Sequence, residues 1–334
     1  MESQSAPSLS VVIPMYNEEE VLPLLAERLR PVLDSLGEEY EVVAVDDGSR
    51  DATPMILAGL RRTWPQLRTI RLRRNCGHQA ALTAGLQRSF GDHVVSIDAD
   101  LQDPPEKILE MLAKARAENL DIVYGIRTDR SSDSLAKRTT AGMYYRLMRA
   151  IAGSPIPAHA GDFRLLSRAT VAALKEMPEH QPVYRLLVPW LGFPSGEVTY
   201  ARAERAAGRT KYPLSKMVRL AVDSITNFST APLRVATWLG LGSFIGCLLL
   251  VLGAVVAYLA GYTVPGWSSL IVAVLFLGGI QLICLGLLGE YIGRIYAAVQ
   301  SRPAYFVAAD SAYSADAAEG VRLPRPRTRD RVTA

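Results

Sequence analysis

The most informative absence in this 334-residue sequence is that of charge between Val235 and Gly289. These 55 consecutive residues contain no Asp, Glu, Lys, Arg or His, and the turn-like stretch GYTVPGW at 261–267 divides them into two apolar halves. Two buried core helices are one interpretation. Each half, however, exceeds the roughly 20 apolar residues that cross a bilayer, and a soluble helix of that length usually carries charge on one face. We therefore predict two transmembrane helices, at about 236–260 and 267–292.

Other absences narrow the class of protein. No G-x-G-x-x-G follows the first apolar run, which argues against a dinucleotide oxidoreductase, and there is no G-x-x-x-x-G-K-[ST] loop. No Cys or His spacing suits zinc. Of the three cysteines, Cys247 and Cys284 lie in the predicted spans and Cys76 is solitary. No disulfide framework is therefore expected in the rest of the chain.

The flanking charges predict how the chain is oriented in the membrane. The N-terminal stretch MESQSAPSLS lacks the apolar segment of a signal peptide. Arg234 precedes the first predicted span and Arg294 follows the second, whereas the loop between them is uncharged. Because positive charge favours the cytoplasmic side, we expect a multi-pass protein of the cytoplasmic (inner) membrane whose soluble N-terminal domain and both termini are cytoplasmic.

Basic residues are concentrated in two places, although the formal net charge is only +4. Residues 200–234 carry seven Lys or Arg against two acids, and residues 321–334 carry five Arg against one Asp. Nucleic acid is one interpretation of such stretches. Anionic lipid headgroups are favoured, because the first stretch adjoins a predicted span. We therefore expect a membrane partner and no nucleic acid, with a disordered final stretch.

Apolar, β-branched runs recur in the first 125 residues with helix-sized gaps between them. The runs are LSVVI (9–13), EVVAV (41–45), LRTIRL (67–72), HVVSI (93–97) and DIVYG (121–125). The gaps fit helices at about 18–36, 51–63, 78–90 and 105–118. This alternation predicts an α/β, Rossmann-like fold with a mostly parallel sheet and helices on both faces.

Acidic clusters follow three of these runs: PMYNEEE, DDGSRDAT and DADLQDPPE. Ligands of parallel sheets collect at the carboxyl ends of the strands. Like charges repel, so a cluster such as Asp98, Asp100 and Asp103 persists most readily around a cation. The alternative is a polar turn that caps the next helix, with Pro104 and Pro105 in its first turn. Three such clusters at one edge favour the metal site.

Several segments occur in the order seen in family 2 glycosyltransferases of GT-A fold. They are VVIPMYNEEE, VVAVDDGSRDAT, RNCGHQAALTAGL, DADLQDPPE, GIRTDR, GDFRLLSR and RAAGRTKY. More narrowly, the chain resembles the polyprenyl-phosphate glycosyltransferases, which include dolichol-phosphate mannose synthases and bactoprenol glucosyltransferases. The resemblance covers residues 9 to about 300, including the two C-terminal spans.

The resemblance implies a nucleotide-sugar donor whose diphosphate is neutralised by Mg²⁺ or Mn²⁺. Asp98, Asp100 and Gln102 match the metal and donor site of the family, and Asp103 is expected to cap the next helix. The other donor-site residues implied by the resemblance are Pro14, Tyr16, Glu18, Asp46, Asp47, Ala99 and Arg127.

Ordinary structural roles stay open for some of these residues. Asp47 also suits a turn before Gly48, and Arg127 also suits an exposed loop charge. His78 and His159 are assigned structural roles, since neither has a spacing that indicates metal ligation.

The resemblance also implies a polyprenyl phosphate acceptor and assigns the catalytic position to Asp162 of GDFRLLSR. A phosphate monoester is largely dianionic near neutral pH, so Asp162 acts either as a base or by orienting the phosphate and balancing charge. Arg164 is expected to contact the donor or the acceptor. The acceptor phosphate is expected to bind Arg202, Arg205 and Lys211, unless this loop is merely a solvated basic one.

The segment before the first span is amphipathic. An apolar stripe at helical spacing consists of Leu214, Val218, Ala221, Ile225 and Phe228. It predicts an interfacial helix, although a helix packed on the core would look similar. The predicted units are a cytoplasmic GT-A domain (1–212), the interfacial segment (213–234), two transmembrane helices (235–293) and a cytoplasmic basic tail (294–334).

These observations together predict a metal-dependent, inverting transferase that moves a sugar from a UDP- or GDP-sugar to polyprenyl phosphate. A processive polysaccharide synthase is disfavoured, because the chain has no Q-x-x-R-W motif and only two predicted spans. A non-catalytic membrane scaffold is disfavoured by the complete set of site residues. The sugar, the nucleotide and the lipid length stay open, as does a homo-oligomeric state, which is tetrameric in some bacterial relatives.

Overall fold

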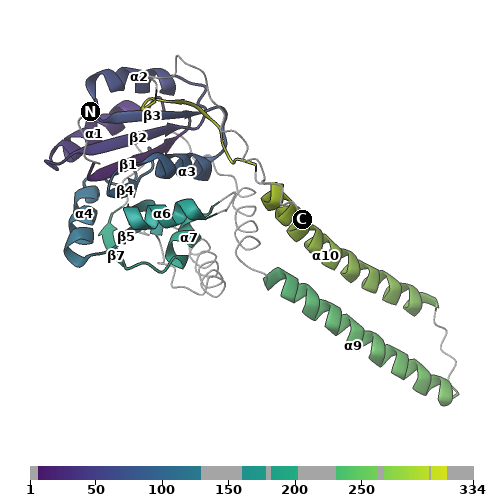
Figure 1. Cartoon of the computed structure of the whole chain (residues 1–334). Coiled ribbons are helices and arrows are strands. Elements are labelled where there is room, and N and C mark those ends of the chain that lie inside the picture. The colour runs from purple at the N-terminus through teal and green to yellow at the C-terminus, as the bar shows by residue number, and fades with distance from the viewer. Residues whose placement is uncertain are drawn as a thin grey trace, which may run out of the picture.

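The computed structural model describes residues 7–128, 160–177, 182–201, 231–261, 267–300 and 302–313. In these residues one eight-stranded sheet has the order β7-β5-β6-β4-β1-β2-β3-β8 (Figure 1). The strands are β1 (Leu9–Met15), β2 (Tyr40–Asp46), β3 (Leu67–Leu72), β4 (His93–Ser96), β5 (Ile122–Arg127), β6 (Ala160–Ser167), β7 (Ser195–Tyr200) and β8 (Val307–Asp310).

The sheet is mostly parallel but mixed. Strands β3, β2, β1 and β4 are parallel neighbours, and so are β5 and β7. Strand β6 runs antiparallel between β4 and β5, and β8 runs antiparallel along the outer edge of β3. The expected α/β fold with a mostly parallel sheet is confirmed. The two antiparallel strands were not anticipated.

Helices cover both faces of the sheet. They are α1 (Leu22–Asp34), α2 (Thr53–Thr63), α3 (His78–Arg88), α4 (Lys107–Glu118), α6 (Arg168–Glu176) and α7 (Tyr184–Trp190). Side chains alternate across a strand, so Val11 of β1 packs with α1, α2 and α4, whereas Val12 packs with α3, α6 and α7. Burial on both faces is the reason why the strands read as continuous apolar runs.

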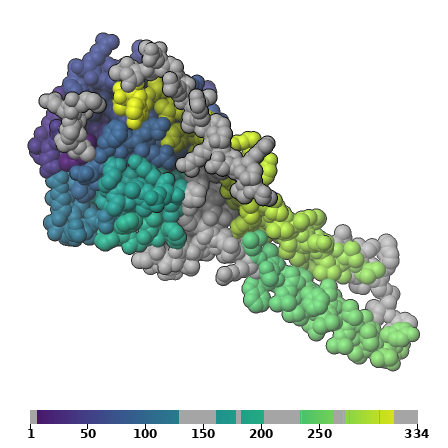
Figure 2. All heavy atoms as spheres, viewed as in Figure 1, coloured from purple at the N-terminus to yellow at the C-terminus, as the bar shows by residue number. Residues whose placement is uncertain are grey.

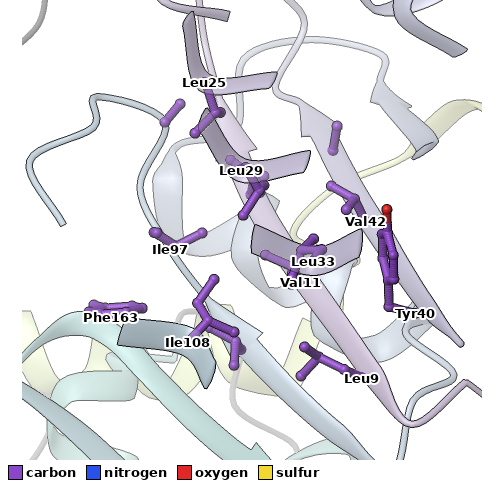
Figure 3. Close-up of a cluster of buried hydrophobic side chains, with 14 of the residues drawn as sticks. Leu9, Val11, Leu25, Leu29, Leu33, Tyr40, Val42, Ile97, Ile108 and Phe163 are labelled. Atoms are coloured by element: carbon purple, nitrogen blue, oxygen red, sulfur yellow. The ribbon is translucent and has the colours of Figure 1, made fainter. Parts of the chain in front are cut away.

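The first of these two cores contains the apolar stripe of α1. Leu25, Leu29 and Leu33 recur at a spacing of four residues, which places them on one face of the helix. Figure 3 shows this face over Val11 of β1 and Val42 of β2.

Two long apolar helices, α9 (Ala231–Leu259) and α10 (Trp267–Gln300), form an antiparallel pair that projects from the sheet domain (Figure 2). The most apolar 18-residue windows within Val235–Leu259 and Val272–Gln300 have mean hydropathies of 2.5 and 2.3, and neither window is buried within the chain. By length and composition both can cross a membrane. The two helices expected from the charge-free segment are confirmed, and α10 continues further than predicted.

Strand β8 returns the chain to the sheet after α10. It begins seven residues beyond Gln300 and pairs with β3, where Figure 1 shows it as the yellow segment. We had grouped these residues with the basic tail. Because β8 and β3 belong to one sheet, the chain that enters α9 and the chain that leaves α10 lie on the same side of any membrane that the pair crosses.

Candidate active site

The carboxyl end of β4 leads into the loop that carries the expected metal ligands. Ser96 ends the strand, and its hydroxyl donates a 2.5 Å hydrogen bond to the main-chain carbonyl of Asp162 on β6. The N–H of Gln102 donates to Asp100 Oδ1 at 3.1 Å. Between these two, Leu101 is buried with a φ of 58°, which is uncommon for a non-glycine residue. The loop therefore has a defined shape imposed by its surroundings.

His78, the first residue of α3, lies between the loop after β4 and the strand β6. Its Nε2 atom is 3.7 Å from Asp98 Oδ1 and 3.5 Å from Asp162 Oδ2. The interpretation of His78 as merely structural missed this position. The available signal was its place after the third strand, at the same sheet edge as the acidic clusters. Asp98, His78 and Asp162 form the centre of the candidate site.

The surroundings shift the pKa values of Asp98 and Asp162 in opposite directions. Burial raises the pKa of Asp98 to about 6, and the neighbouring aspartates add to this effect while His78 opposes it. Burial acts in the same direction on Asp162, but the hydrogen bond from His78 and two arginine charges outweigh it and hold its pKa below the usual range. At neutral pH Asp162 is therefore a stable carboxylate, whereas the negative charge of Asp98 is poorly compensated.

Arg164 points into the protein and not into the site. Its Nη2 atom donates to Asp162 Oδ1 at 2.7 Å and to the carbonyl of Gly161 at 3.1 Å, and its Nη1 atom donates to the carbonyl of Tyr184 at 2.8 Å. The side chain is buried. The expectation that Arg164 contacts a substrate is wrong. Alternation along β6 places it on the same face as Asp162, where α7 covers it and where it fixes the carboxylate.

A second arginine reaches Asp162 from α7. Arg185 Nη2 lies 3.9 Å from Asp162 Oδ2, and the Arg185 side chain is 40% exposed. Sequence reasoning missed this residue. The segment QPVYRLLVPW does not fit the Q-x-x-R-W motif, and the proximity of Arg185 to Asp162 arises only when α7 packs against β6.

Asp46, at the end of β2, stabilises the turn that follows. Its Oδ1 atom accepts from the N–H of Ser49 at 2.8 Å, and its Oδ2 atom is 3.3 Å from Arg71 Nε. The turn residue Gly48 has a φ of 68°, and a Cβ atom there would lie 2.7 Å from the carbonyl carbon of Arg74. Only glycine fits this position without rearrangement.

Asp47 connects the end of β2 to the start of α3. Its two carboxylate oxygens accept from the N–H groups of Cys76 and Gly77 at 2.7 and 2.8 Å. Burial raises the pKa of Asp47, against the effect of these hydrogen bonds. Asp47 thereby fixes the residue next to His78. Its expected contact with a donor base stays a prediction.

The loop after β1 lies against the loop after β2. Asn17, with a φ of 54°, accepts from the N–H of Arg50, and the N–H of Glu18 donates to Thr53 Oγ1, each at 2.9 Å. The expected donor residues of this region sit at the same edge of the sheet: Pro14 in β1, Tyr16 and Glu18 in its loop, and buried Ala99 after β4. These residues therefore share one edge of the sheet, and their contact with a donor stays a prediction.

Asp103 is not a helix cap. The N-cap of α4 is Glu106, without a side-chain cap, whereas Asp103 is fully buried and accepts from the hydroxyl of Tyr200 and from Arg127 Nη2 at 3.2 Å. Arg127 Nε donates to the same hydroxyl at 3.1 Å. The cap prediction is wrong, because Tyr200 lies almost a hundred residues further along the chain. Arg127 is held here beside Gly161, the residue before Asp162.

The described residues of the loop after β4 supply only part of a cation site. Among the residues that the structure describes, no three His, Cys, Asp or Glu side chains are arranged to bind a metal. Asp98 and Asp100 supply carboxylate oxygens, and the raised pKa of Asp98 marks negative charge that a cation would offset. Mg²⁺ commonly binds through one or two carboxylates plus substrate phosphates. The residues present therefore fit a cation that arrives with a diphosphate.

The expected acceptor residues Arg202, Arg205 and Lys211 lie outside the described residues. The same holds for His159, for most of the amphipathic segment and for the end of the basic tail. Their roles stay predictions.

Known proteins resemble the chain along most of its length. Residues 10–174 match the model of glycosyl transferase family 2, and residues 231–295 match the GtrB C-terminal hairpin. The uncharacterized glycosyltransferase YkcC of Bacillus subtilis is 45% identical, with 89% of this chain and 92% of that protein covered. The SfII prophage-derived bactoprenol glucosyl transferase of Shigella flexneri is 42% identical, with 90% and 97% covered.

A solved structure supports the fold. Glucosyl-3-phosphoglycerate synthase of Mycobacterium tuberculosis, crystallised with Mn²⁺, UDP and phosphoglyceric acid, matches with a TM-score of 0.50 and 21% identity, covering 66% of this chain and 76% of that one. At this identity the likeness extends to the GT-A fold alone. The sequence relatives go further, and on their identity and coverage the chain belongs to glycosyl transferase family 2.

Proposed function

We propose that this protein transfers a sugar from a UDP- or GDP-sugar to polyprenyl phosphate in the cytoplasmic membrane, with inversion at the anomeric carbon. The observation that carries the proposal is the meeting of Asp98 and Asp162 around His78, in a chain that continues into a membrane-sized helical pair. The names of the relatives support a bactoprenol-type acceptor. A sheet that is continuous with β8 supports placing the catalytic domain and the end of α10 on one side of the membrane, and the flanking Arg234 and Arg294 favour the cytoplasmic side.

The donor would bind at the carboxyl edge of the sheet. The residues that would hold Mg²⁺ or Mn²⁺ are Asp98, Asp100 and Gln102, and the ion would neutralise the diphosphate leaving group. The loops after β1 and β2 would surround the nucleoside, with Asp47 fixing the neighbouring start of α3. Arg127 would add positive charge beside Gly161, held there by Asp103 and Tyr200.

Asp162 would orient the acceptor and balance charge instead of removing a proton. Its pKa is held below the usual range for a carboxyl group, so it is a weak proton acceptor. The acceptor phosphate is largely dianionic near neutral pH and needs no proton removed before it attacks. In the transfer, a phosphate oxygen of the lipid bonds to the anomeric carbon as the bond from that carbon to the donor diphosphate breaks.

The experiment uses the full chain in membranes or mixed micelles. It would be given a panel of radiolabelled UDP- and GDP-sugars with polyprenyl phosphate and the metal, and label would be measured in the organic phase. One sugar should label the lipid, and the Asp162→Asn protein should do so with a much lower kcat while both substrates still bind. Failure of every sugar to label the lipid, with no release of UDP or GDP, would refute the proposal.

A further inference from the structure

Two arginines approach Asp162, one at each carboxylate oxygen. Arg164 forms a short, buried pair with Asp162 Oδ1 at 2.7 Å, which neutralises this carboxylate. Arg185 adds a second positive charge on the other oxygen, at the longer distance of 3.9 Å. A solvent-exposed pair of that length contributes little to stability. Arg185 therefore helps to keep Asp162 ionised but adds little to the stability of the fold, which leaves its guanidinium available for a ligand.

Arg185 is held firmly in place although its guanidinium is exposed. The preceding residue, Tyr184, is buried, and its carbonyl accepts from Arg164 Nη1. The Tyr184 hydroxyl donates to Thr83 Oγ1 at 2.9 Å, and the main-chain N–H of Tyr184 donates to Gln79 Oε1 at 3.4 Å. Both partners lie in α3, the helix that begins with His78. These hydrogen bonds connect the start of α7 to β6 and α3. They fix the backbone from which the Arg185 side chain extends toward the carboxylate of Asp162.

A phosphate that approaches Asp162 needs a cation of this kind. Two negative groups in one partly desolvated site repel each other unless a positive group lies between or beside them. An exposed guanidinium has donors to spare and binds phosphate in a bidentate manner. The expected donor cations are elsewhere: the metal site lies on the loop after β4, and Arg127 is held by Asp103 and Tyr200. Arg185 is thus the described arginine that is both beside Asp162 and exposed.

We infer that Arg185 binds the phosphate monoester of the acceptor and positions its attacking oxygen beside Asp162. The inference rests on the proposed function and deepens it, since it assigns the acceptor phosphate a contact that the basic loop at 202–211 alone does not provide. It is a residue of the acceptor site and does not touch the donor.

The test compares Arg185→Ala and Arg185→Lys with Arg116→Ala in the full-length protein. Arg116 is a matched control: it is 41% exposed and pairs with Glu38, a residue next to the amino end of β2 and away from the site. For Arg185→Ala we expect the KM for polyprenyl phosphate to rise roughly ten- to a hundredfold, with the KM for the nucleotide-sugar within about twofold. For Arg185→Lys we expect an intermediate KM for polyprenyl phosphate, because lysine keeps the positive charge but cannot donate two parallel hydrogen bonds as a guanidinium does.

A direct binding measurement separates this inference from the proposed function. Farnesyl phosphate and farnesol would be titrated against each protein, with UDP and GDP in parallel. Weaker binding of farnesyl phosphate to Arg185→Ala, with farnesol unchanged, would support the inference even if no sugar were ever transferred. A selective loss of UDP or GDP binding would overturn it and assign Arg185 to the donor. Unchanged binding of every ligand would overturn it as well.

Discussion

Removing the carboxylate of Asp310 should release β8 from the edge of the sheet. Asp310 forms a bidentate pair with Arg68 of β3, with Nε to Oδ1 at 3.0 Å and Nη2 to Oδ2 at 2.8 Å. The two side chains are only 9% and 6% exposed. Arg88 Nε lies 3.6 Å from the same carboxylate. The pair is therefore the buried centre of the contact between β8 and β3.

The size of the effect follows from what Asp310→Ala leaves behind. Breaking a buried ion pair costs about 3–5 kcal/mol, because one charge stays buried without its partner. Glu41 Oε2 lies 3.6 Å from Arg68 Nη1 and would still compensate part of that charge. We therefore expect a free-energy cost at the low end of this range, about 3 kcal/mol. This cost corresponds to a roughly hundredfold higher population of the state in which β8 has detached.

Hydrogen exchange of the full-length protein in detergent would measure this opening. The reporting amides are Arg73, which donates to Phe306, and Ser311, which donates to Thr69, each at 2.9 Å. Their exchange should become roughly a hundredfold faster in Asp310→Ala, whereas amides in the centre of β1 should not change.

Two further variants make the experiment decisive. Glu106→Ala removes an exposed partner of Arg28 and should cost less than about 1 kcal/mol. The double variant Arg68→Met, Asp310→Leu removes both buried charges and should recover most of the protection. Unchanged exchange in Asp310→Ala would refute the assignment of this pair as the contact that holds β8.

Three other predictions concern the site and the membrane. Asp100→Ala should abolish transfer and divalent-dependent donor binding while leaving the fold intact by circular dichroism; full activity, or wild-type activity that survives EDTA, would contradict the metal site. Protonation of Asp98 competes with the metal because its pKa is raised to about 6. With saturating UDP or GDP present, metal affinity measured by calorimetry should fall about tenfold per pH unit below that value and be flat above it. A constant affinity between pH 5 and 7 would contradict this. An impermeant thiol reagent should label a cysteine placed at 261–266 from outside the cell and none in the tail; labelling of the tail would reverse the topology.

Features that depend on local pattern were predictable from the sequence. The charge-free segment predicted two apolar helices, and the β-branched runs predicted β1 to β5, because burial on both faces of a parallel sheet demands continuous apolar residues. The acidic clusters predicted which edge of the sheet carries the site, since parallel strands bring their carboxyl ends together.

Features that depend on distant partners were not predictable. Asp103 looked like a cap because two prolines follow it, and its actual partners come from β5 and β7. Arg164 looked available to a substrate, and only the packing of α7 shows that it is enclosed. His78 and Arg185 lie next to Asp162 only because α3 and α7 pack against β6. A single sequence carries no pattern that specifies such pairings.

If the pair of α9 and α10 crosses a bilayer, the pairing of β8 with β3 attaches the sheet domain to that bilayer at a second point. The chain runs into α9 on one side, and on the other side only six residues, spanning at most about 25 Å, separate the end of α10 from the start of β8. A domain attached once can swivel about its linker, whereas one attached twice can only rock about the line between its attachments. The candidate site would then stay at a nearly constant distance from the membrane surface as the domain moves. A lipid substrate would reach it by diffusion within the plane of the membrane.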